Sequence, residues 1–246
     1  MERRVSQATT SPRAVILAGG LGMRLRPYTM VLPKPLTPLN EQPIIEHIIR
    51  RLAVNGVNRI DLCLGHLGGL IQTYLSQATT LPPDVELGYH WEDEPQGTAG
   101  ALRDFRDTED PLIVTNGDIL TSLDYGELLR AHVESGAALT IAMREEKVQV
   151  SLGVIERSNG RVLGYREKPT LTYEASMGIY VYGPEALAAL PDEGACQFPD
   201  LVMRLLDAGE HILPFSTNAA WYDIGTPAEY ERAMVDLRER PEVYAT

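Results

Sequence analysis

A glycine-rich stretch with basic residues near the start of the chain has the composition of a phosphate-binding loop. The apolar run Ala14 to Ala18 is typical of a buried strand, and Gly19, Gly20 and Gly22 follow it. Glycines let backbone N–H groups approach an anion, and cationic side chains add charge-assisted hydrogen bonds. The basic residues that come next are Arg24, Arg26 and Lys34. The stretch therefore predicts a phosphate site at the end of a strand.

Two common phosphate-binding motifs do not fit this stretch. No Lys followed by Ser or Thr stands at the spacing of a P-loop, and Leu25 stands where a dinucleotide fingerprint needs its third glycine. Both motifs also need a helix directly after the turn. The prolines between Arg26 and Leu39 exclude that helix.

Further motifs along the chain complete a known pattern. The glycine-rich loop and Pro33-Lys34-Pro35-Leu36 are followed by motifs in this order: Glu94-Pro95-Gln96-Gly97-Thr98-Ala99-Gly100, Asn116-Gly117-Asp118, Glu167-Lys168-Pro169 and Trp221-Tyr222-Asp223-Ile224-Gly225. With these motifs the chain resembles the sugar-1-phosphate nucleotidyltransferases, the pyrophosphorylases that make nucleotide sugars. It looks most similar to mannose-1-phosphate and heptose-1-phosphate guanylyltransferases. Two residues depart from the pattern: Met23 stands where Thr or Ser is common, and Ser176 where Asn is common.

The resemblance implies a role for each motif. Arg24 and Lys34 are expected to be catalytic, Arg24 by holding the triphosphate and Lys34 by aligning the reacting phosphates. Mg²⁺ is expected between Asp118 and Asp223. The residues expected to bind the nucleotide are Leu17, Ala18, Gly19, Gly20, Gly22, Met23, Gln96, Gly97, Thr98 and Asn116. Those expected on the sugar-phosphate side are Gly117, Glu167, Lys168, Ser176 and Gly178.

Several of these motifs also have an ordinary structural interpretation when each is considered alone. Gln96 can donate and accept at once and so read the edge of a base, but the same stretch could be an acidic turn capped by Thr98. Asp118 at the end of a strand is where a Mg²⁺ ligand should lie, but Asn-Gly-Asp is also a common turn. Glu167 and Lys168 could be a solvated surface pair. The order of the whole motif set favours the functional interpretation.

Composition limits the class of protein. The chain has 246 residues, 44% of them hydrophobic, and a net charge of −12. This composition predicts one large α/β domain over residues 13–246 and argues against nucleic acid or an anionic membrane as a partner. Cys63 and Cys196 have no metal-ligand spacing and are expected to be inert thiols, as in a reducing, cytoplasmic location. Residues 1–12 are polar and predict a flexible leader.

Strand and helix patterns alternate through the first half of the chain. Residues 13–135 predict a mainly nucleotide-binding half, and residues 136–246 a mainly sugar-binding half with antiparallel hairpins, one of them turning at Ser158-Asn159-Gly160. The expected fold is a three-layer α/β/α Rossmann-like nucleotidyltransferase fold. Its central sheet should be mixed and mainly parallel, with a smaller antiparallel part at the sugar side. No hexapeptide repeats follow, so no left-handed β-helix domain is expected.

The resemblance implies transfer of a nucleoside monophosphate from an NTP to a sugar 1-phosphate. The sugar phosphate has a second pKa of about 6, so it arrives largely as a dianion and needs no general base. GTP with mannose or heptose 1-phosphate is favoured, with thymidylyl or uridylyl transfer to glucose-type 1-phosphates as the alternative. A catalytically silent regulatory binder and a glycosyltransferase are two further alternatives. The oligomeric state stays open, and a homodimer or higher homo-oligomer is one of its alternatives.

Overall fold

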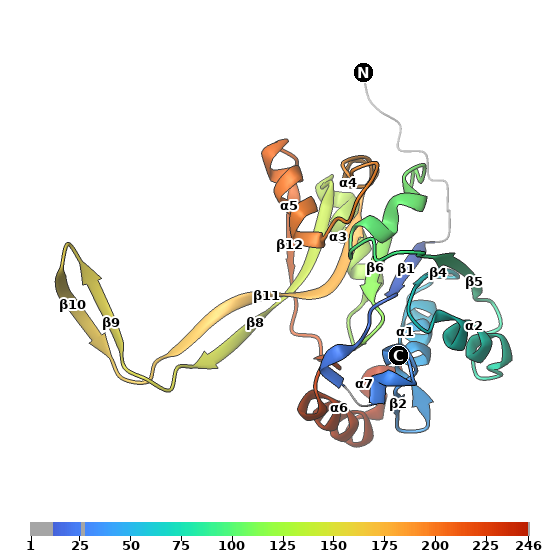
Figure 1. The fold of residues 1–246 in the computed structure, drawn as a ribbon, viewed down its shortest axis with the longest axis horizontal. Helices are drawn as coiled ribbons and strands as arrows, with labels where there is room; N and C mark the ends of the chain where they lie inside the picture. Colours follow the sequence, from blue (N-terminus) through green and yellow to red (C-terminus); the bar gives the residue numbers. More distant parts are fainter. Residues whose placement is uncertain (1–11, 26–27, 246) are drawn as a thin grey trace.

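A central mixed sheet organises the protein (Figure 1). The computed structural model describes residues 12–25 and 28–245, and within them the sheet has seven strands in the order β12-β8-β11-β6-β1-β4-β5. The strands are β1 (Arg13–Ala18), β4 (Arg59–Leu64), β5 (Glu86–Trp91), β6 (Leu112–Asn116), β8 (Leu139–Gln149), β11 (Thr170–Tyr182) and β12 (Ile212–Ser216). All run parallel except β11, which is antiparallel to β6 and β8. The predicted mixed, mainly parallel α/β sheet is confirmed.

Helices and short pairs of strands complete the fold. The helices are α1 (Ile44–Val54), α2 (Gly68–Gln77), α3 (Tyr125–Ser135), α4 (Pro184–Ala188), α5 (Phe198–Asp207), α6 (Pro227–Glu239) and α7 (Pro241–Ala245). The paired short strands are β2 (Pro38–Leu39) with β3 (Gln42–Pro43), β7 (Ile119–Thr121) with β13 (Trp221–Asp223), and β9 (Val154–Ser158) with β10 (Arg161–Arg166). Within the described ranges, no helix combines the length and apolar character needed to cross a membrane. The predicted leader, apart from Pro12, and Arg26 lie outside the described residues.

Both faces of the sheet are covered, which accounts for the two core clusters. Successive side chains of a strand point to opposite faces, so Ile16 of β1 joins one cluster while Val15 joins the other. The first cluster includes residues of α1, α2, α3 and α6, and the second includes residues of α4 and α5. This arrangement is the predicted three-layer architecture.

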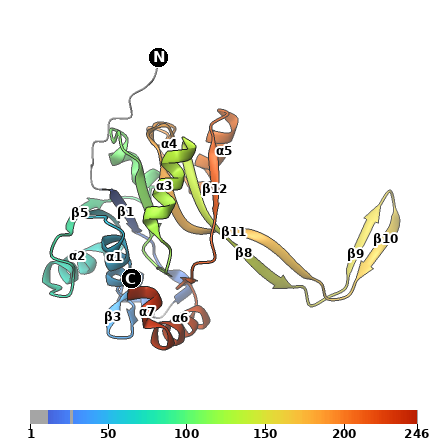
Figure 2. The ribbon, with the colours of Figure 1, turned by 180° about the vertical axis from the view of Figure 1, so that it is seen from behind.

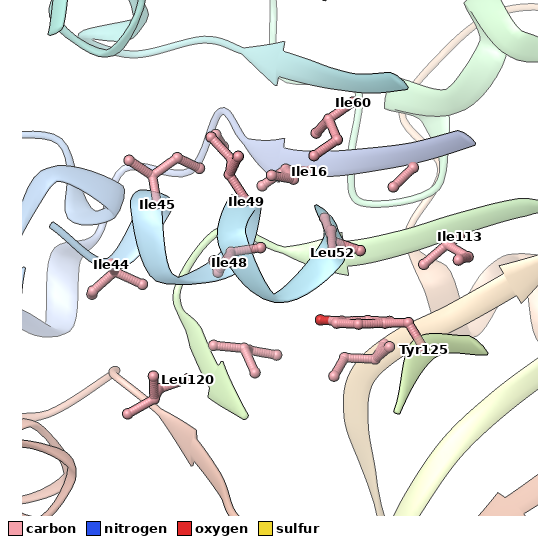
Figure 3. Packing of buried hydrophobic residues seen from close by; sticks show 14 of the residues in the cluster. Ile16, Ile44, Ile45, Ile48, Ile49, Leu52, Ile60, Ile113, Leu120 and Tyr125 are labelled. Carbon is pink, nitrogen blue, oxygen red and sulfur yellow. The ribbon is translucent and has the colours of Figure 1, made fainter. Parts of the chain in front are cut away.

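Helix α1 shows how the sequence pattern becomes packing (Figure 3). Its isoleucines recur at helical spacing, and Ile45, Ile48 and Ile49 are buried against the sheet with Ile16 and Ile60. Side-chain caps fix the start of two other helices, α3 and α6. Asp124 accepts a hydrogen bond from Glu127 N (2.7 Å), and Thr226 accepts one from Glu229 N (3.3 Å).

Three elements differ from what the sequence predicts. The sequence predicts a helix from Ala99 to Arg106, and the observed element is a 3-10 helix, Gly100–Phe105. The N–H groups of Ala99 and Gly100 both donate to Cys196 O (3.0 Å each), so a distant segment fixes the start of this helix. The sequence also predicts strands at 137–143 and 176–182. The observed strands are longer, because β8 and β11 continue beyond the sheet as a paired ribbon.

This ribbon forms an arm that projects from the body (Figures 1 and 2). The β9–β10 hairpin lies at its end, and its turn has positive φ at Asn159 (48°) and Gly160 (75°). Positive φ at both positions is what a type I′ turn requires, so the predicted hairpin turn is confirmed. The arm residues are mostly exposed. The length of the arm was missed because exposed strands carry no periodic apolar signal.

The packing of α1 yields a stability prediction. Ile49 is fully buried, so Ile49→Ala should lower the free energy of unfolding by about 2–5 kcal/mol, measured by urea denaturation. Val54→Ala on the same helix removes a side chain that is 59% exposed and should change stability by less than about 0.5 kcal/mol. Equal losses in the two variants would contradict this account of the core.

Candidate functional site

The loops that follow four parallel strands all lie at one edge of the sheet. Strands β1, β4, β5 and β6 end at Ala18, Leu64, Trp91 and Asn116, and all four run in the same direction. Ligands of open α/β sheets bind outside the carboxyl ends of such strands. Two adjoining cavities lie at this edge, of about 370 Å³ and about 630 Å³.

The smaller cavity is formed by the predicted phosphate loop. It is lined by Leu17, Ala18, Gly20, Gly22, Met23, Arg24, Lys34, Pro35, Gly117, Asp118 and Gly225. Thr29 Oγ1 donates to Gly22 O (2.7 Å), and Leu25 N donates to the same oxygen (3.1 Å), so the turn is held from its outer side. Met23, which departs from the expected family pattern, is 63% exposed and lines this cavity.

A buried lysine joins the two carboxylates predicted to bind metal. The Lys34 Nζ contacts Asp118 Oδ2 in a short ion pair and lies 3.4 Å from Asp223 Oδ1. The Lys34 side chain is only 9% exposed. Arg24 Nη2 lies 3.6 Å from the other oxygen of Asp223. Both predicted catalytic cations and both predicted metal ligands therefore converge on one point.

Contacts between distant strands bring these residues together. Asp118 follows β6 and lies directly before β7, and Asp223 is the last residue of β13, which pairs with β7. Ile224 N donates to Asp118 O (2.9 Å), which fixes the two carboxylates beside each other. Gly117 N donates to Leu17 O (2.8 Å) and holds the same turn against β1. Strand pairing thus brings distant parts of the chain to the phosphate loop.

The carboxylate pair fits a Mg²⁺ ion that is shared with a substrate. Among residues 12–25 and 28–245, no cluster of three or more His, Cys, Asp or Glu side chains could hold a metal by itself. Mg²⁺ is usually bound through one or two carboxylates together with substrate phosphates. Asp118 and Asp223 supply two carboxylates beside a loop suited to phosphate. They are the residues that would hold Mg²⁺ here.

The larger cavity receives residues from loops far apart in the chain. It is lined by Leu17, Gly19, Gly20, Leu21, Gly65, His66, Glu92, Asp93, Pro95, Gly97, Thr98, Ala101, Asn116, Asp118 and Gln197. Gln197 lies directly before α5, and its Oε1 lies 3.4 Å from Thr98 N, while Phe198 N donates to Thr98 Oγ1 (2.9 Å). Thr98 thus joins two loops and does not cap its own turn. Glu92 and Gln197 were not identified as site residues from the sequence; Glu92 directly follows β5.

The side-chain oxygen of Gln96, the residue predicted to bind the base, already accepts a hydrogen bond within the protein. Arg103 Nη1 donates to Gln96 Oε1 (2.8 Å), and Arg103 Nε donates to Pro191 O (2.8 Å). The residues described as lining the two cavities do not include Gln96. Its observed contacts therefore secure the loop beside the cavity.

The remaining predicted sugar-side residues lie along the arm. Glu167 and Lys168 lie where the β9–β10 hairpin joins the ribbon, away from the body (Figure 2). Ser176 and Gly178 lie at the root of the ribbon, where the pairing of β11 with β8 shifts register. Gly178 has φ +70°, and a Cβ there would lie 2.6 Å from Asn116 Nδ2, so only glycine fits. The structure thus brings Ser176 and Gly178 to the body and leaves Glu167 and Lys168 apart from Asp118.

Other polar residues have structural roles. Burial raises the pKa of both the Cys63 and the Cys196 thiols, consistent with the inert thiols expected. His132 is buried, and its Nδ1 lies 2.8 Å from Thr140 Oγ1. Burial lowers the pKa of His132, as expected for a neutral packing residue.

Comparison with known proteins identifies the family. Residues 13–240 match the family model described as nucleotidyl transferase. The chain belongs to the nucleotidyl transferase family. The predicted membership is confirmed, and the match covers the loop, both carboxylates and the arm.

Relatives within this family carry different substrate names. The UTP–glucose-1-phosphate uridylyltransferase of Synechocystis is 30% identical over 93% of this chain, which spans 64% of that protein. The D-glycero-alpha-D-manno-heptose 1-phosphate guanylyltransferase of Aneurinibacillus thermoaerophilus is 28% identical over 92% of this chain and 98% of its own length. The relatives therefore agree on the class of reaction and differ in base and sugar.

Solved structures of similar fold include two that are 25% identical. One is a putative glucose-1-phosphate thymidylyltransferase from Bacillus anthracis in complex with a sucrose, with a TM-score of 0.73 over 93% of this chain and 96% of that one. The other is HddC from Yersinia pseudotuberculosis complexed with GMP-PN, with a TM-score of 0.70 over 92% of this chain and 99% of that one. These neighbours confirm the nucleotidyltransferase fold.

The position of Lys34 yields a prediction about metal binding. Its ammonium and Mg²⁺ would compete for the same two carboxylates, so Lys34→Met should strengthen the response to Mg²⁺ in the absence of nucleotide. We expect MgCl₂ to raise the Tm of this variant by about 2–4 °C more than that of the wild type, in a thermal-shift titration. Lys147→Met removes an exposed arm lysine paired with Glu145 and should respond like the wild type. Identical Mg²⁺ shifts in all three proteins would contradict the competition.

Proposed function

We propose that this protein transfers a nucleoside monophosphate from a nucleoside triphosphate to a sugar 1-phosphate and releases pyrophosphate. The observation that supports this most directly is the contact of Lys34 with Asp118 and Asp223 beside the phosphate loop. An oxygen of the sugar phosphate attacks the α-phosphorus of the triphosphate. The bond from that phosphorus to the bridging oxygen of the β-phosphate breaks, and pyrophosphate leaves with the electron pair.

The chain's own residues position the reactants and neutralise their charge. The dianionic sugar phosphate needs no base, so catalysis depends on alignment and electrostatics. Arg24 is exposed at the mouth of the smaller cavity and can close on the β- and γ-phosphates. Lys34 is nearly buried and lines the same cavity, where its ammonium would align the reacting phosphates. When bound by Asp118 and Asp223, Mg²⁺ supplies Lewis-acid neutralisation of the phosphate oxygens.

We assign GTP as the nucleotide and a mannose- or heptose-type 1-phosphate as the acceptor. The motif set resembles guanylyltransferases, and the heptose 1-phosphate guanylyltransferase relative aligns over nearly its whole length. A solved neighbour was crystallised with GMP-PN. Uridylyl or thymidylyl transfer to a glucose-type 1-phosphate is the alternative, since relatives with those names also match.

The direct test is a pyrophosphate-release assay. The purified protein is supplied with each of five nucleoside triphosphates and with mannose, heptose or glucose 1-phosphate in turn. We expect release with a sugar 1-phosphate and the highest kcat/KM with GTP. A protein that binds these ligands but releases no pyrophosphate with any pair would be a silent regulatory homologue.

Arg24 tests the phosphate assignment in the same assay. Arg24→Ala removes charge-assisted hydrogen bonds to the triphosphate and should lower kcat/KM by about 100-fold. Arg59→Ala is the control, because Arg59 begins β4 at the opposite edge of the sheet and is 61% exposed. Wild-type kcat/KM in Arg24→Ala would show that Arg24 does not hold the phosphates.

The arm supplies the sugar-phosphate contact in this proposal. Lys168 has φ +43°, a left-handed conformation that costs a non-glycine residue roughly 1–3 kcal/mol and is concentrated at functional sites. A strained backbone at Lys168 would not be needed if Glu167 and Lys168 were only a solvated surface pair. We propose that the arm bends toward the cavities when the sugar phosphate binds, so that Lys168 and Glu167 reach it.

Two arm lysines provide a matched test. Lys168→Ala should raise the KM for the sugar 1-phosphate by about 10-fold or more while the KM for the nucleoside triphosphate stays unchanged. Lys147→Ala on the same arm should leave both values unchanged, because Lys147 is paired with Glu145. An equal effect on both substrates in Lys168→Ala would assign the residue to folding of the arm instead.

A further inference from the structure

A bulge in β11 marks the point where the arm leaves the body. Ser176 is paired with Met143 of β8 and Tyr180 with Ile141, so four steps along β11 match only two along β8. Gly178 lies inside this bulge with φ +70°. A bulge bends the strand that contains it, so this one sets the direction in which the arm projects from the sheet (Figure 1).

One side-chain contact spans the bulge. The Ser176 hydroxyl donates to Tyr180 Oη (3.3 Å) and accepts from Gly178 N (3.3 Å). Ser176 lies at the end of the bulge that leads to the arm, and Tyr180, which is only 7% exposed, lies at the end inside the sheet. The conformation of the bulge therefore depends on where the Tyr180 ring is held.

The Tyr180 ring is held by Phe198 of α5. The two rings stack with their centroids 3.9 Å apart and their planes 25° from parallel. Phe198 is the first residue of α5, and its N–H donates to Thr98 Oγ1 (2.9 Å). The residue before it, Gln197, lines the larger cavity together with Thr98. Only one stacked pair thus separates the wall of this cavity from the bulge.

The segment before Phe198 is neither helix nor strand and is held by the loop that follows β5. Two N–H groups of that loop donate to Cys196 O (3.0 Å each), and Cys196 N donates to Gln96 O (2.8 Å). Residues 192–195 are exposed, and exposed segments with few packing contacts open most easily. Under the proposed function the base of the nucleotide occupies the larger cavity, which both segments line, so its binding restricts them together.

We propose that Phe198 and Tyr180 are positioning residues that couple the nucleotide site to the arm. A nucleotide in the larger cavity fixes Phe198, the stack fixes the Tyr180 ring, and the contact of Tyr180 with Ser176 fixes the bulge. Less conformational entropy is then lost when the sugar 1-phosphate draws the arm in, so it binds more tightly. This inference rests on the proposed function, which assigns Glu167 and Lys168 of the arm to the sugar phosphate.

The test measures the coupling between the two ligands. Calorimetric titration in Mg²⁺ gives the Kd of mannose 1-phosphate without and with saturating α,β-methylene GTP, whose methylene bridge prevents the transfer. Glucose 1-phosphate and α,β-methylene UTP replace this pair if the protein binds them instead. We expect the analogue to lower the Kd of the sugar phosphate by about 5- to 10-fold, and the sugar phosphate to lower the Kd of the analogue by the same factor. A wild type without this coupling overturns the inference.

Variants along the path separate coupling from stability. Tyr180→Phe removes only the hydroxyl and should reduce the coupling to less than about 2-fold while the Kd of each ligand alone stays unchanged. Phe198→Leu removes the stack, and the double variant should lose no further coupling because the two contacts act in series. Tyr173→Phe makes the same change where β11 is exposed (51%) and should keep the wild-type coupling.

Two outcomes with these variants would contradict the path. Full coupling in Tyr180→Phe would remove the hydroxyl from it, and an equal loss in Tyr173→Phe would show that the effect is not specific to the bulge. If Phe198→Leu does not fold, the comparison of Tyr180→Phe with Tyr173→Phe still decides between these outcomes.

Hydrogen exchange separates this inference from the proposed function, because it needs neither turnover nor a sugar phosphate. The nucleotide analogue alone should slow exchange of the backbone amides of residues 174–178 in the wild type but not in Tyr180→Phe. If the wild type shows this protection but releases no pyrophosphate, the proposed function fails and the coupling stands. If it releases pyrophosphate without this protection, the coupling fails and the proposed function stands.

Discussion

The contact of the Lys34 ammonium with Asp118 and Asp223 determines the shape of the site. An ammonium that is nearly buried must be paired, because removing it from water without a partner is costly. The two carboxylates come from the β6–β7 turn and from β13, and Lys34 comes from the loop that follows β1. The ion pairs of Lys34 therefore join three separate parts of the chain beside the phosphate loop.

Charge is divided between the two cavities. The chain carries a net charge of −12, yet Arg24 and Lys34 face the smaller cavity and Glu92 and Asp93 face the larger one. A nucleotide has the complementary distribution, with anionic phosphates at one end and N–H donors on the base. Local fields in a cleft can therefore bind an anion that the whole protein would repel.

The arm and the body meet at a close contact. Gly178 lies at the shift of register between β8 and β11, and its backbone packs against Asn116 and Ile119. Trp221 Nε1 donates to Met177 O (2.8 Å) beside it, and Ser176 Oγ accepts from Gly178 N (3.3 Å). The root of the arm therefore packs against the same edge of the sheet as the loops that line the two cavities. Ser176 stabilises the bulge, which gives a structural reason for a small hydroxyl side chain there.

The sequence by itself determined the elements and their order, because their causes are local. The apolar run before Gly19 predicted β1 and the loop at its carboxyl end, and Asn159-Gly160 predicted its turn. The resemblance to a known family implied the roles of Arg24, Lys34, Asp118 and Asp223, and the structure brings these residues together. Only the tertiary structure decided that Lys34 lies between the carboxylates, that Arg103 engages Gln96 and that Gln197 enters the cavity. These contacts join residues from separate strands and loops, so no spacing along the chain encodes them.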